Sequence, residues 1–231
     1  MAVSLSKGQG ISLKKSEFDL SQVTIGLGWD VADSFKTIEQ TVEKKKAGIA
    51  GMFGGTETAT ELIQVPEEYD LDVIAFLCGH DGKVNIEKDQ QGQMILADGD
   101  IIFYNYESHS SGHIYTTGDN RTGEGDGDDE QIIVKLNSLS SDYQKIAFIV
   151  QIYNGIENDQ AFGKVKQAYI RAVDARGAEM ARYDLSGGKG FEDCRSMLFA
   201  ELVRENDNWK FNAIGEPSPA DSFVSWIKKY S

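Results

Sequence analysis

A short acidic segment, residues 118–130, contains the residue types that bind hard metal ions. It reads Gly-Asp-Asn-Arg-Thr-Gly-Glu-Gly-Asp-Gly-Asp-Asp-Glu and holds six carboxylates, one Asn and four glycines, with Arg121 as its single basic residue. Ca²⁺ takes about 6–8 oxygen ligands, backbone carbonyls among them, and glycines let the chain curve around the ion. The segment therefore predicts a Ca²⁺ site.

The same composition is also typical of solvated turns, so this alternative stays open. The segment is not an EF-hand loop, because that pattern requires a glycine in its sixth place, and Gln131 follows the series Asp126, Asp128 and Glu130. A Ca²⁺ site here must therefore take further ligands from other parts of the fold.

Asp70 and Asp72 are a second source of carboxylates. They are two residues apart in a run with the strand-like sequence Tyr-Asp-Leu-Asp-Val-Ile, so on a strand both would point to one face. Leu71 and Val73 would then face a hydrophobic core. Because neighbouring carboxylates repel one another, this arrangement favours a cation nearby.

The remaining sequence predicts an all-β fold, with short apolar runs separated by turn residues such as Asn206-Asp-Asn208. The predicted strands lie near residues 10–13, 22–28, 71–77, 101–104, 131–136, 145–153, 167–174, 178–184, 197–204 and 208–214. After Ser218-Pro219, apolar residues recur at helical spacing, at Phe223, Trp226, Ile227 and Tyr230. We expect a β-sandwich of two mostly antiparallel sheets, with a C-terminal amphipathic helix docked on it.

Residues 32–67 form an insertion that is expected to be partly helical or flexible. The helical expectation for residues 33–46 rests on apolar residues at positions i, i+3 and i+7, namely Phe35, Ile38 and Val42. A glycine-rich apolar stretch, residues 48–55, follows it. One interpretation is a flexible loop. The other is an interaction arm in which Lys44-Lys-Lys46 and the apolar stretch contact a membrane surface or a partner groove.

Composition narrows the classes of function. The chain of 231 residues has 40% apolar residues, enough for a sizeable core, and a formal net charge of −14, which disfavours binding to nucleic acid or anionic membranes. Cys78 and Cys194 lie far apart and lack metal-ligand spacing, and Cys78 is expected to pack in the core. With no signal-peptide pattern and no apolar run of about 18 residues, we expect a soluble cytoplasmic protein.

Signs of catalysis are few. His109 and His113 are four residues apart, but Ser108-His-Ser-Ser-Gly-His113 is typical of a loop, so we expect solvated histidines rather than a zinc site. The sequence has no Gly-x-Ser-x-Gly elbow and shows no pairing of Cys with His that would indicate a nucleophile. We therefore expect that the protein is not an enzyme.

Taken in order, several motifs resemble the TerD family of tellurium-resistance and general stress proteins, over most of residues 1–31 and 68–215. The acidic segment 118–130 is the most specific of them. The others are Val3-Ser-Leu-Ser-Lys-Gly8, Val23-Thr-Ile-Gly-Leu-Gly-Trp-Asp30, Tyr69-Asp-Leu-Asp-Val-Ile-Ala-Phe-Leu77, Asp81-Gly-Lys-Val84, Asp100-Ile-Ile-Phe-Tyr-Asn105, Gln160-Ala-Phe-Gly163, Ala181-Arg-Tyr-Asp-Leu185 and Trp209-Lys-Phe-Asn-Ala213.

The resemblance implies one β-sandwich domain over residues 1–231, with the insertion inside it, that binds Ca²⁺ through clustered acidic residues. The positions that match are Asp30, Asp70, Asp72, Asn105, Asp119, Asn120, Glu124, Asp128, Asp129 and Glu130, with the carbonyls of Gly123 and Gly125 completing the shell. It also implies resistance to tellurite and other chemical stress, within complexes of related and membrane-bound family proteins.

Two other functions are compatible with these residues. An acidic cluster can position divalent ions that activate water, as in a metal-dependent hydrolase. A β-sandwich with Ca²⁺ can also be a lectin-like ligand-binding module. A non-catalytic stress protein, in which Ca²⁺ stabilises the fold and partner binding carries the function, is the expectation favoured by the sequence, because a proton-handling group outside the acidic cluster is not evident.

Overall fold

The computed structural model describes residues 3–30, 35–45, 54, 56–96, 99–118, 127–184 and 190–231. The chain divides into two compact units. One comprises Met1–Val31 together with Tyr69–Ser231, and the other comprises Ala32–Glu68.

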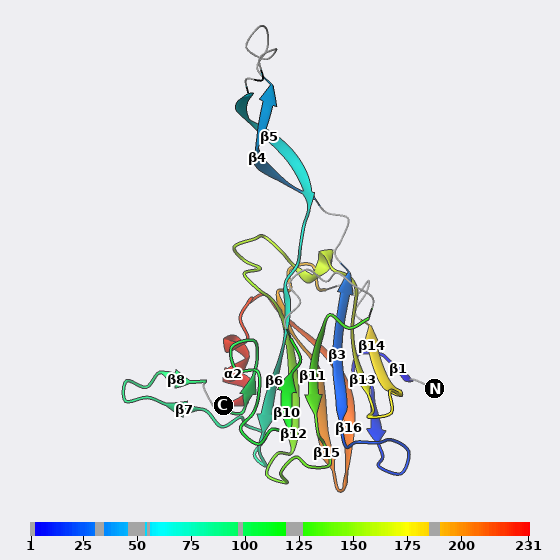
Figure 1. Cartoon of the computed structure of the whole chain (residues 1–231). Coiled ribbons are helices and arrows are strands. Elements are labelled where there is room, and N and C mark those ends of the chain that lie inside the picture. The colour runs from blue at the N-terminus through cyan, green and yellow to red at the C-terminus, as the bar shows by residue number, and fades with distance from the viewer. Residues whose placement is uncertain are drawn as a thin grey trace. The chain divides into compact units, whose positions relative to one another are not determined.

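The larger unit contains two sheets, and within the described residues each has six strands (Figure 1). The first sheet has the order β1-β14-β13-β3-β11-β10, with β1 parallel to β14 and the other neighbours antiparallel. Its strands are β1 (Val3–Leu5), β3 (Val23–Asp30), β10 (Ile114–Thr116), β11 (Glu130–Val134), β13 (Lys166–Val173) and β14 (Glu179–Asp184).

The second sheet has the order β2-β16-β15-β12-β6-β9 and is antiparallel throughout its described pairs. Its strands are β2 (Gly10–Leu13), β6 (Leu71–Cys78), β9 (Ile101–Ile102), β12 (Lys145–Ile152), β15 (Ser196–Glu205) and β16 (Asn208–Ser218). A short hairpin of β7 (Glu87–Lys88) and β8 (Met94–Ile95) and a 3₁₀ turn at Phe162–Lys164 complete the strands and turns of this unit.

The main hydrophobic core contains buried residues of both sheets. In β3 the odd-numbered residues Val23, Ile25, Leu27 and Trp29 belong to this core. Because successive side chains of a strand point to opposite faces, Gly26 and Gly28 lie on the outer face of the first sheet. This outer face is where the acidic residues described below are positioned.

The predicted C-terminal helix is confirmed as α2 (Val224–Tyr230). Phe223, Trp226, Ile227 and Tyr230 are all buried, in a second cluster that includes Phe76 of β6. The Trp226 indole also donates to the Ser196 hydroxyl at 2.9 Å. The helix begins six residues later than Ser218, because that residue still belongs to β16.

The predicted fold class is confirmed, and each of the ten predicted strands overlaps an observed strand. Four further strands of the larger unit, β1, β7, β8 and β10, have two or three residues each and were not among the predicted strands. Strands this short contain too few residues to show the alternation of apolar and polar side chains on which the prediction depends.

The smaller unit corrects the prediction for residues 33–46. Its described residues form an antiparallel hairpin of β4 (Phe35–Lys45) and β5 (Thr56–Pro66), not a helix. Ile38 and Val42 pair with Ile63 and Ala59 and share one face of the ribbon. Phe35, the third residue that suggested a helix, is an odd number of residues away and lies on the other face. β-Branched residues favour strands, and the pairing partner begins more than ten residues later, outside any local helical window.

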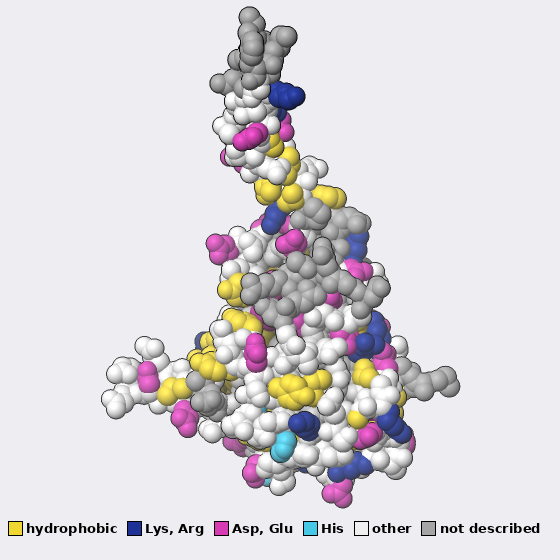
Figure 2. Space-filling model, in the orientation of Figure 1, with side chains coloured by type: hydrophobic (Ala, Val, Ile, Leu, Met, Phe, Trp, Pro, Cys, Tyr) yellow, Lys and Arg dark blue, Asp and Glu magenta, His cyan; other side chains and the backbone are white. Residues whose placement is uncertain are grey.

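Hydrophobic side chains are visible on the surface of this hairpin (Figure 2). Phe35, Ile38 and Leu62 are 59%, 37% and 71% exposed, respectively. On the larger unit, the face seen in Figure 2 carries Asp and Glu side chains interspersed with Lys and Arg. In the described part of the chain no helix is long and apolar enough to cross a membrane.

Candidate metal centre

The structure describes one end of the acidic segment, residues 127–130, together with Gly118 before it. The predicted ligands Asp119, Asn120, Gly123, Glu124 and Gly125 lie outside the described residues. The predicted ligands whose positions can be compared are Asp30, Asp70, Asp72, Asn105, Asp128, Asp129 and Glu130.

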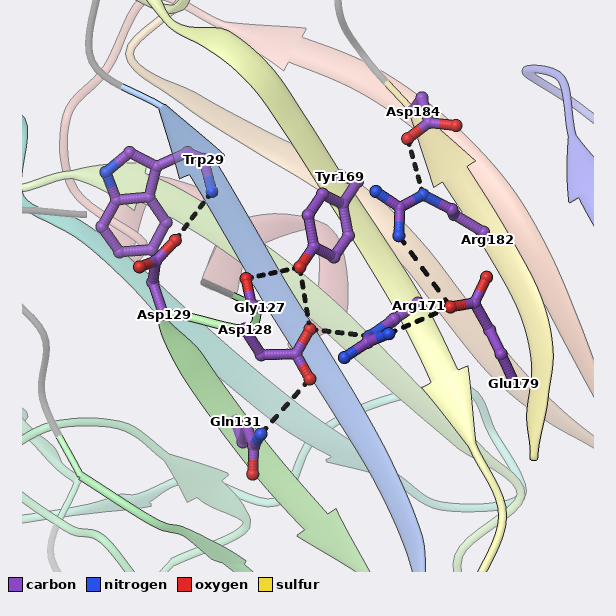
Figure 3. Close-up of polar contacts among 10 residues, drawn as sticks. All are labelled: Trp29, Gly127, Asp128, Asp129, Gln131, Tyr169, Arg171, Glu179, Arg182 and Asp184. Carbon is purple, nitrogen blue, oxygen red and sulfur yellow. Dashed lines mark hydrogen bonds and ion pairs between the residues drawn. The ribbon is translucent and has the colours of Figure 1, made fainter. Parts of the chain in front are cut away.

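Asp128 is held by a cation and two neutral donors on the outer face of the first sheet (Figure 3). Its Oδ1 accepts a hydrogen bond from Arg171 Nε at 2.7 Å and lies 3.1 Å from the Tyr169 hydroxyl. Its Oδ2 accepts a hydrogen bond from Gln131 Nε2 at 3.2 Å. The side chain is 2% exposed, so this carboxylate is nearly enclosed by its partners.

Two glycines of β3 make room for this arrangement. A Cβ atom on Gly26 would lie 2.2 Å from the Asp128 carboxylate, and one on Gly28 would lie 2.4 Å from the Tyr169 ring. Real Cβ atoms do not approach other atoms this closely. The Gly-x-Gly spacing in this strand therefore allows Asp128 and Tyr169 to lie directly across it.

Arg171 is the first member of a series of side chains of alternating charge that crosses β13 and β14 (Figure 3). Its Nη1 lies 3.1 Å from Glu179, Glu179 lies 3.9 Å from Arg182, and Arg182 Nε lies 2.9 Å from Asp184. Arg182 also stacks over the Tyr169 ring, 3.6 Å from its centroid. These contacts hold the surroundings of Asp128 rigidly.

The charge states follow from these contacts. The hydrogen bond to Asp128 raises the pKa of Arg171, although burial opposes this. Burial, followed by the nearby Asp128 charge, raises the pKa of Tyr169 to about 12. The phenol is therefore protonated at neutral pH and acts as a hydrogen-bond donor. The Gly127 carbonyl oxygen lies 2.6 Å from the Tyr169 hydroxyl.

Asp129 points to the end of β3 rather than along its outer face. Its backbone N–H donates to the Leu27 carbonyl at 2.8 Å, and its Oδ2 accepts a hydrogen bond from Trp29 N at 2.9 Å. Burial raises the pKa of Asp129, and the charges of Asp30 and Asp128 raise it further, against the Trp29 hydrogen bond. Asp129 therefore lies in a region of negative potential.

Asp30 completes this group at the last position of β3. Its carboxylate accepts a hydrogen bond from Gln167 Nε2. Gln167 has φ +51° and occurs where the register of β13 against β3 shifts. Such irregularities redirect side chains, and this one brings the Gln167 amide to Asp30.

These residues surround a small cavity of about 320 Å³. It is lined by Trp29, Asp30, Gly127, Asp129, Gln167, Tyr169 and Arg182. Its polar groups are carboxylates, a carbonyl, an amide and a phenol, together with the Arg182 guanidinium, and none contains sulfur. The cavity directly adjoins the start of the described acidic segment at Gly127.

Glu130 links the two sheets. It is 5% exposed, and its Oε2 accepts a hydrogen bond from Val73 N of β6 at 2.6 Å. A second link runs from the Trp29 indole, whose Nε1 donates to the Tyr69 carbonyl at 3.1 Å. These two bonds bring the Asp70–Asp72 strand to the acidic end of the first sheet.

Asp72 lies on the face of β6 that packs toward α2. Its Oδ2 accepts a hydrogen bond from Gln151 Nε2 at 2.9 Å, and Gln151 Oε1 accepts one from Phe223 N at the start of the helix. Burial raises the pKa of Tyr104, and the charges of Asp72 and Asp70 add to this effect. The two charges therefore both act on Tyr104, and Asp70 and Asp72 make up a second acidic group.

Asn105 is exposed in the turn between Phe103 and Tyr106, and no described contact joins it to either group. In the described part of the chain, no three His, Cys, Asp or Glu side chains converge closely enough to hold a metal ion. A complete metal site at this end of the sandwich would require the part of the acidic segment that lies outside the described residues.

Tyr169, Arg171 and Gln167 make direct contacts with the acidic residues and were not among the predicted site residues. The signal that could have indicated the first two is the alternation Tyr169-x-Arg171 beside Arg182-x-Asp184, which places polar residues on the outer face of two neighbouring strands. For Gln167 no local signal exists, because its position depends on the strand irregularity.

The prediction of solvated histidines was wrong for His109. This residue does lie in a loop, but it is 9% exposed and contacts Asp100 and Ser111. Cys78 and Cys194 are buried free thiols, and burial raises the pKa of Cys78 to about 12 and that of Cys194 to about 11. Both are therefore protonated at neutral pH and lie within the core clusters.

Comparison with known proteins gives a consistent result. The TerD domain family profile matches residues 1–230. The tellurium resistance protein TerX of Serratia marcescens is 59% identical over 231 residues, covering 100% of both chains. The tellurium resistance protein TerD of the same organism is 38% identical, covering 94% of this chain and 91% of its own.

Relatives outside that group include general stress protein 16U of Bacillus subtilis, which is 32% identical and covers 93% of this chain and 90% of its own. None of these three names is that of an enzyme. The crystal structure of a homologue of telluride resistance protein (TerD) from Streptomyces coelicolor superposes with a TM-score of 0.58 at 16% identity. The superposition covers 91% of this chain and 98% of the other, and it supports the fold.

Proposed function

Because the chain belongs to the TerD family of tellurium-resistance and stress-response proteins, we propose that it binds Ca²⁺ at the acidic end of its sandwich and acts without catalysis. In this proposal the ion stabilises the fold and prepares a surface for partner proteins. The relatives' names describe resistance and stress response, and the mechanism proposed here rests on the residues of this chain.

The observation that carries the proposal is the placement of Asp30 and Asp129 on one small cavity next to the acidic segment. Burial is the largest cause of the raised pKa of Asp129, and the negative charges of Asp30 and Asp128 raise it further. This indicates an excess of negative charge around Asp129. A divalent cation would lower that potential. The further carboxylates of residues 119–126 directly precede Gly127 in the sequence and would increase both the repulsion and the gain from binding.

The donor set fits a hard cation. The carboxylates and carbonyls at this end offer oxygen, and both cysteines are buried as protonated thiols within the core clusters. Flexible oxygen-rich surroundings favour Ca²⁺ over Mg²⁺, which requires a near-ideal octahedron. The ligands we propose are Asp30 and Asp129, with Asp119, Asn120, Glu124 and the carbonyls of Gly123 and Gly125 from the acidic segment.

The other acidic residues would act indirectly. Asp128 is bound to Arg171, and Glu130 accepts a hydrogen bond from β6, so both would position the segment rather than donate to the ion. Asp70 and Asp72 would contribute negative potential from the second sheet. Such supporting contacts orient ligands and tune the affinity of a metal site.

The energetic consequence is linkage between ion binding and folding. Ca²⁺ would bind the assembled site and not the unfolded chain, so it should add about 2.7 kcal/mol to the free energy of unfolding at a hundredfold excess over Kd. Calorimetric titration of chelator-stripped protein with Ca²⁺ and then Mg²⁺, with thermal melting in parallel, tests this directly. Absence of Ca²⁺ binding, turnover of phosphoesters or retention on glycan surfaces would each contradict the proposal.

For partner binding we propose the β4–β5 hairpin as the contact element. Phe35 and Leu62 are largely exposed, and a two-stranded ribbon leaves the outer edge of each strand able to pair with another chain. Related tellurium-resistance proteins, including membrane-bound ones, are the partners we expect. Replacing residues 33–66 by a short linker should preserve melting of the larger unit and abolish capture of a co-expressed TerD-family protein.

Point variants sharpen this test. Phe35→Ser and Leu62→Ser should weaken capture, whereas Thr60→Ser, on the same hairpin, should leave it unchanged. Unchanged capture after removal of the hairpin would show that partner binding uses another surface.

A further inference from the structure

A cavity of about 820 Å³ lies in the larger unit, away from the acidic cluster of the first sheet. Its walls come from α2, from the segment 79–86 that follows β6, and from the β7–β8 hairpin (Figure 1). Asp100, Asp142 and Tyr143 close it from the side of the second sheet. Cavities of this volume, with an apolar lining and a few convergent polar groups, are typical of small-molecule sites.

The apolar part of the lining is formed by Val84, Ile86, Met94, Val224 and Ile227. Val84 and Ile227 are buried at the base, whereas Met94 and Val224 are 41% and 38% exposed. The side chains of Met94 and Val224 therefore present apolar surface that the described residues leave accessible. A bound apolar group would cover it.

Asp100 is the most enclosed charged group of the lining, with a side chain that is 14% exposed. Its Oδ1 accepts a hydrogen bond from the Tyr143 hydroxyl at 2.6 Å and lies 3.2 Å from His109 Nε2. Burial raises the pKa of Tyr143, and the hydrogen bond to Asp100 raises it further, so the phenol remains a donor. Among the described residues, the hydrogen bonds to this carboxylate all involve Oδ1, and Asp100 is one of the residues that line the cavity.

The other charged groups lie at the rim. Asp81, Lys83, Lys88, Asp142 and Lys228 are exposed, so water screens them. Lys83 Nζ donates to the Ser231 carbonyl at 3.1 Å, which directs it toward the end of the chain. The charge that a buried ligand would meet is therefore the Asp100 carboxylate.

We propose that this cavity binds a small amphipathic amine, whose protonated amino group donates to Asp100 and whose apolar body packs against Met94, Val224 and Ile227. A charge-assisted hydrogen bond to a partly enclosed carboxylate is stronger than one between neutral groups. An anionic head group would be repelled at the same position. The inference is independent of the proposed Ca²⁺ site, because the two cavities share no lining residue.

The first experiment compares three probes that share an eight-carbon chain. Octylammonium, octanol and octanoate are titrated into the full-length protein by calorimetry at neutral pH and low ionic strength. We expect octylammonium to bind at least about tenfold more tightly than octanol, and octanoate to bind most weakly, as a charge-assisted bond to Asp100 requires. Equal binding of the three probes, or no binding of any, would overturn the proposal.

The second experiment uses variants. Asp100→Asn should reduce the preference for octylammonium over octanol to nearly one, whereas Asp207→Asn, an equal change of charge in the exposed β15–β16 turn, should preserve it. Met94→Ala and Val224→Ala should weaken the binding of all three probes to a similar extent. A preference that survives Asp100→Asn would overturn the assignment of the carboxylate, and if that variant fails to fold, the probe series on the unaltered protein still decides.

Discussion

Asp128 Oδ1 lies 2.7 Å from Arg171 Nε, and the carboxylate of this ion pair is almost completely enclosed. A residue that the sequence ranks among the metal ligands is thus already neutralised by a cation of the protein itself. The pair joins the end of the acidic segment to β13, so Asp128, like Glu130, anchors the segment, whereas Asp30 and Asp129 can respond to an ion.

The anchoring role predicts a loss of stability that does not depend on Ca²⁺. Asp128→Asn would leave Arg171 without its enclosed counter-charge and should lower the free energy of unfolding by about 3 kcal/mol in the presence of a chelator. Denaturant unfolding measures this. Asp207→Asn is the control, because it changes the net charge by the same amount. An equal loss of unfolding free energy in this control would show that net charge, and not the ion pair, is responsible.

In contrast to Asp128→Asn, Asp129→Asn should affect Ca²⁺ binding and leave the stability of the Ca²⁺-free protein intact. The amide oxygen can still accept the Trp29 hydrogen bond, and the substitution removes a negative charge beside Asp30 and Asp128. Without Ca²⁺ the variant should be as stable as the original protein or more so, while the rise in melting temperature on adding Ca²⁺ should be lost. A full Ca²⁺-dependent rise in the variant would exclude Asp129 as a ligand.

The pH dependence of Asp129 follows from the direction of its pKa shift. Its pKa is raised in the folded protein, so between the unfolded value of about 3.9 and the folded value the native state binds more protons. Without Ca²⁺, the contribution of Asp129 to stability should therefore fall as pH rises through this window. The difference in unfolding free energy between the original protein and Asp129→Asn, measured at several pH values, should show this fall.

Gly26→Ala should be destabilising although alanine favours strands more than glycine does. The added Cβ would lie 2.2 Å from the Asp128 carboxylate, which Arg171, Tyr169 and Gln131 hold in place. Overpacking of this kind costs about 1–3 kcal/mol. Gly79→Ala is the matched control, since its Cβ would meet its nearest atom at 3.5 Å. Equal melting temperatures for the two variants would contradict the predicted close packing.

Asp174 should make the larger unit sensitive to acid. Burial raises its pKa, but backbone N–H groups of Asp19, Ala178 and Arg176 and the Arg176 guanidinium outweigh this and lower it to about 2. The stability it contributes is complete above the unfolded pKa and is lost as pH falls toward 2. The loss should be about 1 kcal/mol, because the exposed Arg176 is screened by water.

The test compares acid unfolding of the original protein with that of Asp174→Asn. The variant should be less stable at neutral pH, and the difference should shrink as pH falls from about 4 to about 2. A difference that stays constant over this range would indicate that the lost hydrogen bonds, and not the charge, account for the change.

Much of the fold was predictable because its signals are local. Alternation of apolar and polar residues indicated the long strands, and Phe223, Trp226, Ile227 and Tyr230 indicated the terminal helix, since a strand or helix must bury one face wherever it packs. The prediction failed for residues 35–45 because the stabilising partner of β4 is β5, which begins eleven residues after β4 ends. A pattern within one strand cannot contain that information.

The candidate site divides in the same way. The sequence by itself determined the β-sandwich and the gathering of carboxylates at 118–130 and 70–72, because composition and spacing are properties of a segment. The order of its motifs added the resemblance to the TerD family. Only the tertiary structure decided that Asp128 pairs with Arg171, that Glu130 joins the sheets and that Asp30 and Asp129 share a cavity. Those contacts depend on strands that are distant in sequence and adjacent in space, and their charges interact only after folding has removed the water between them.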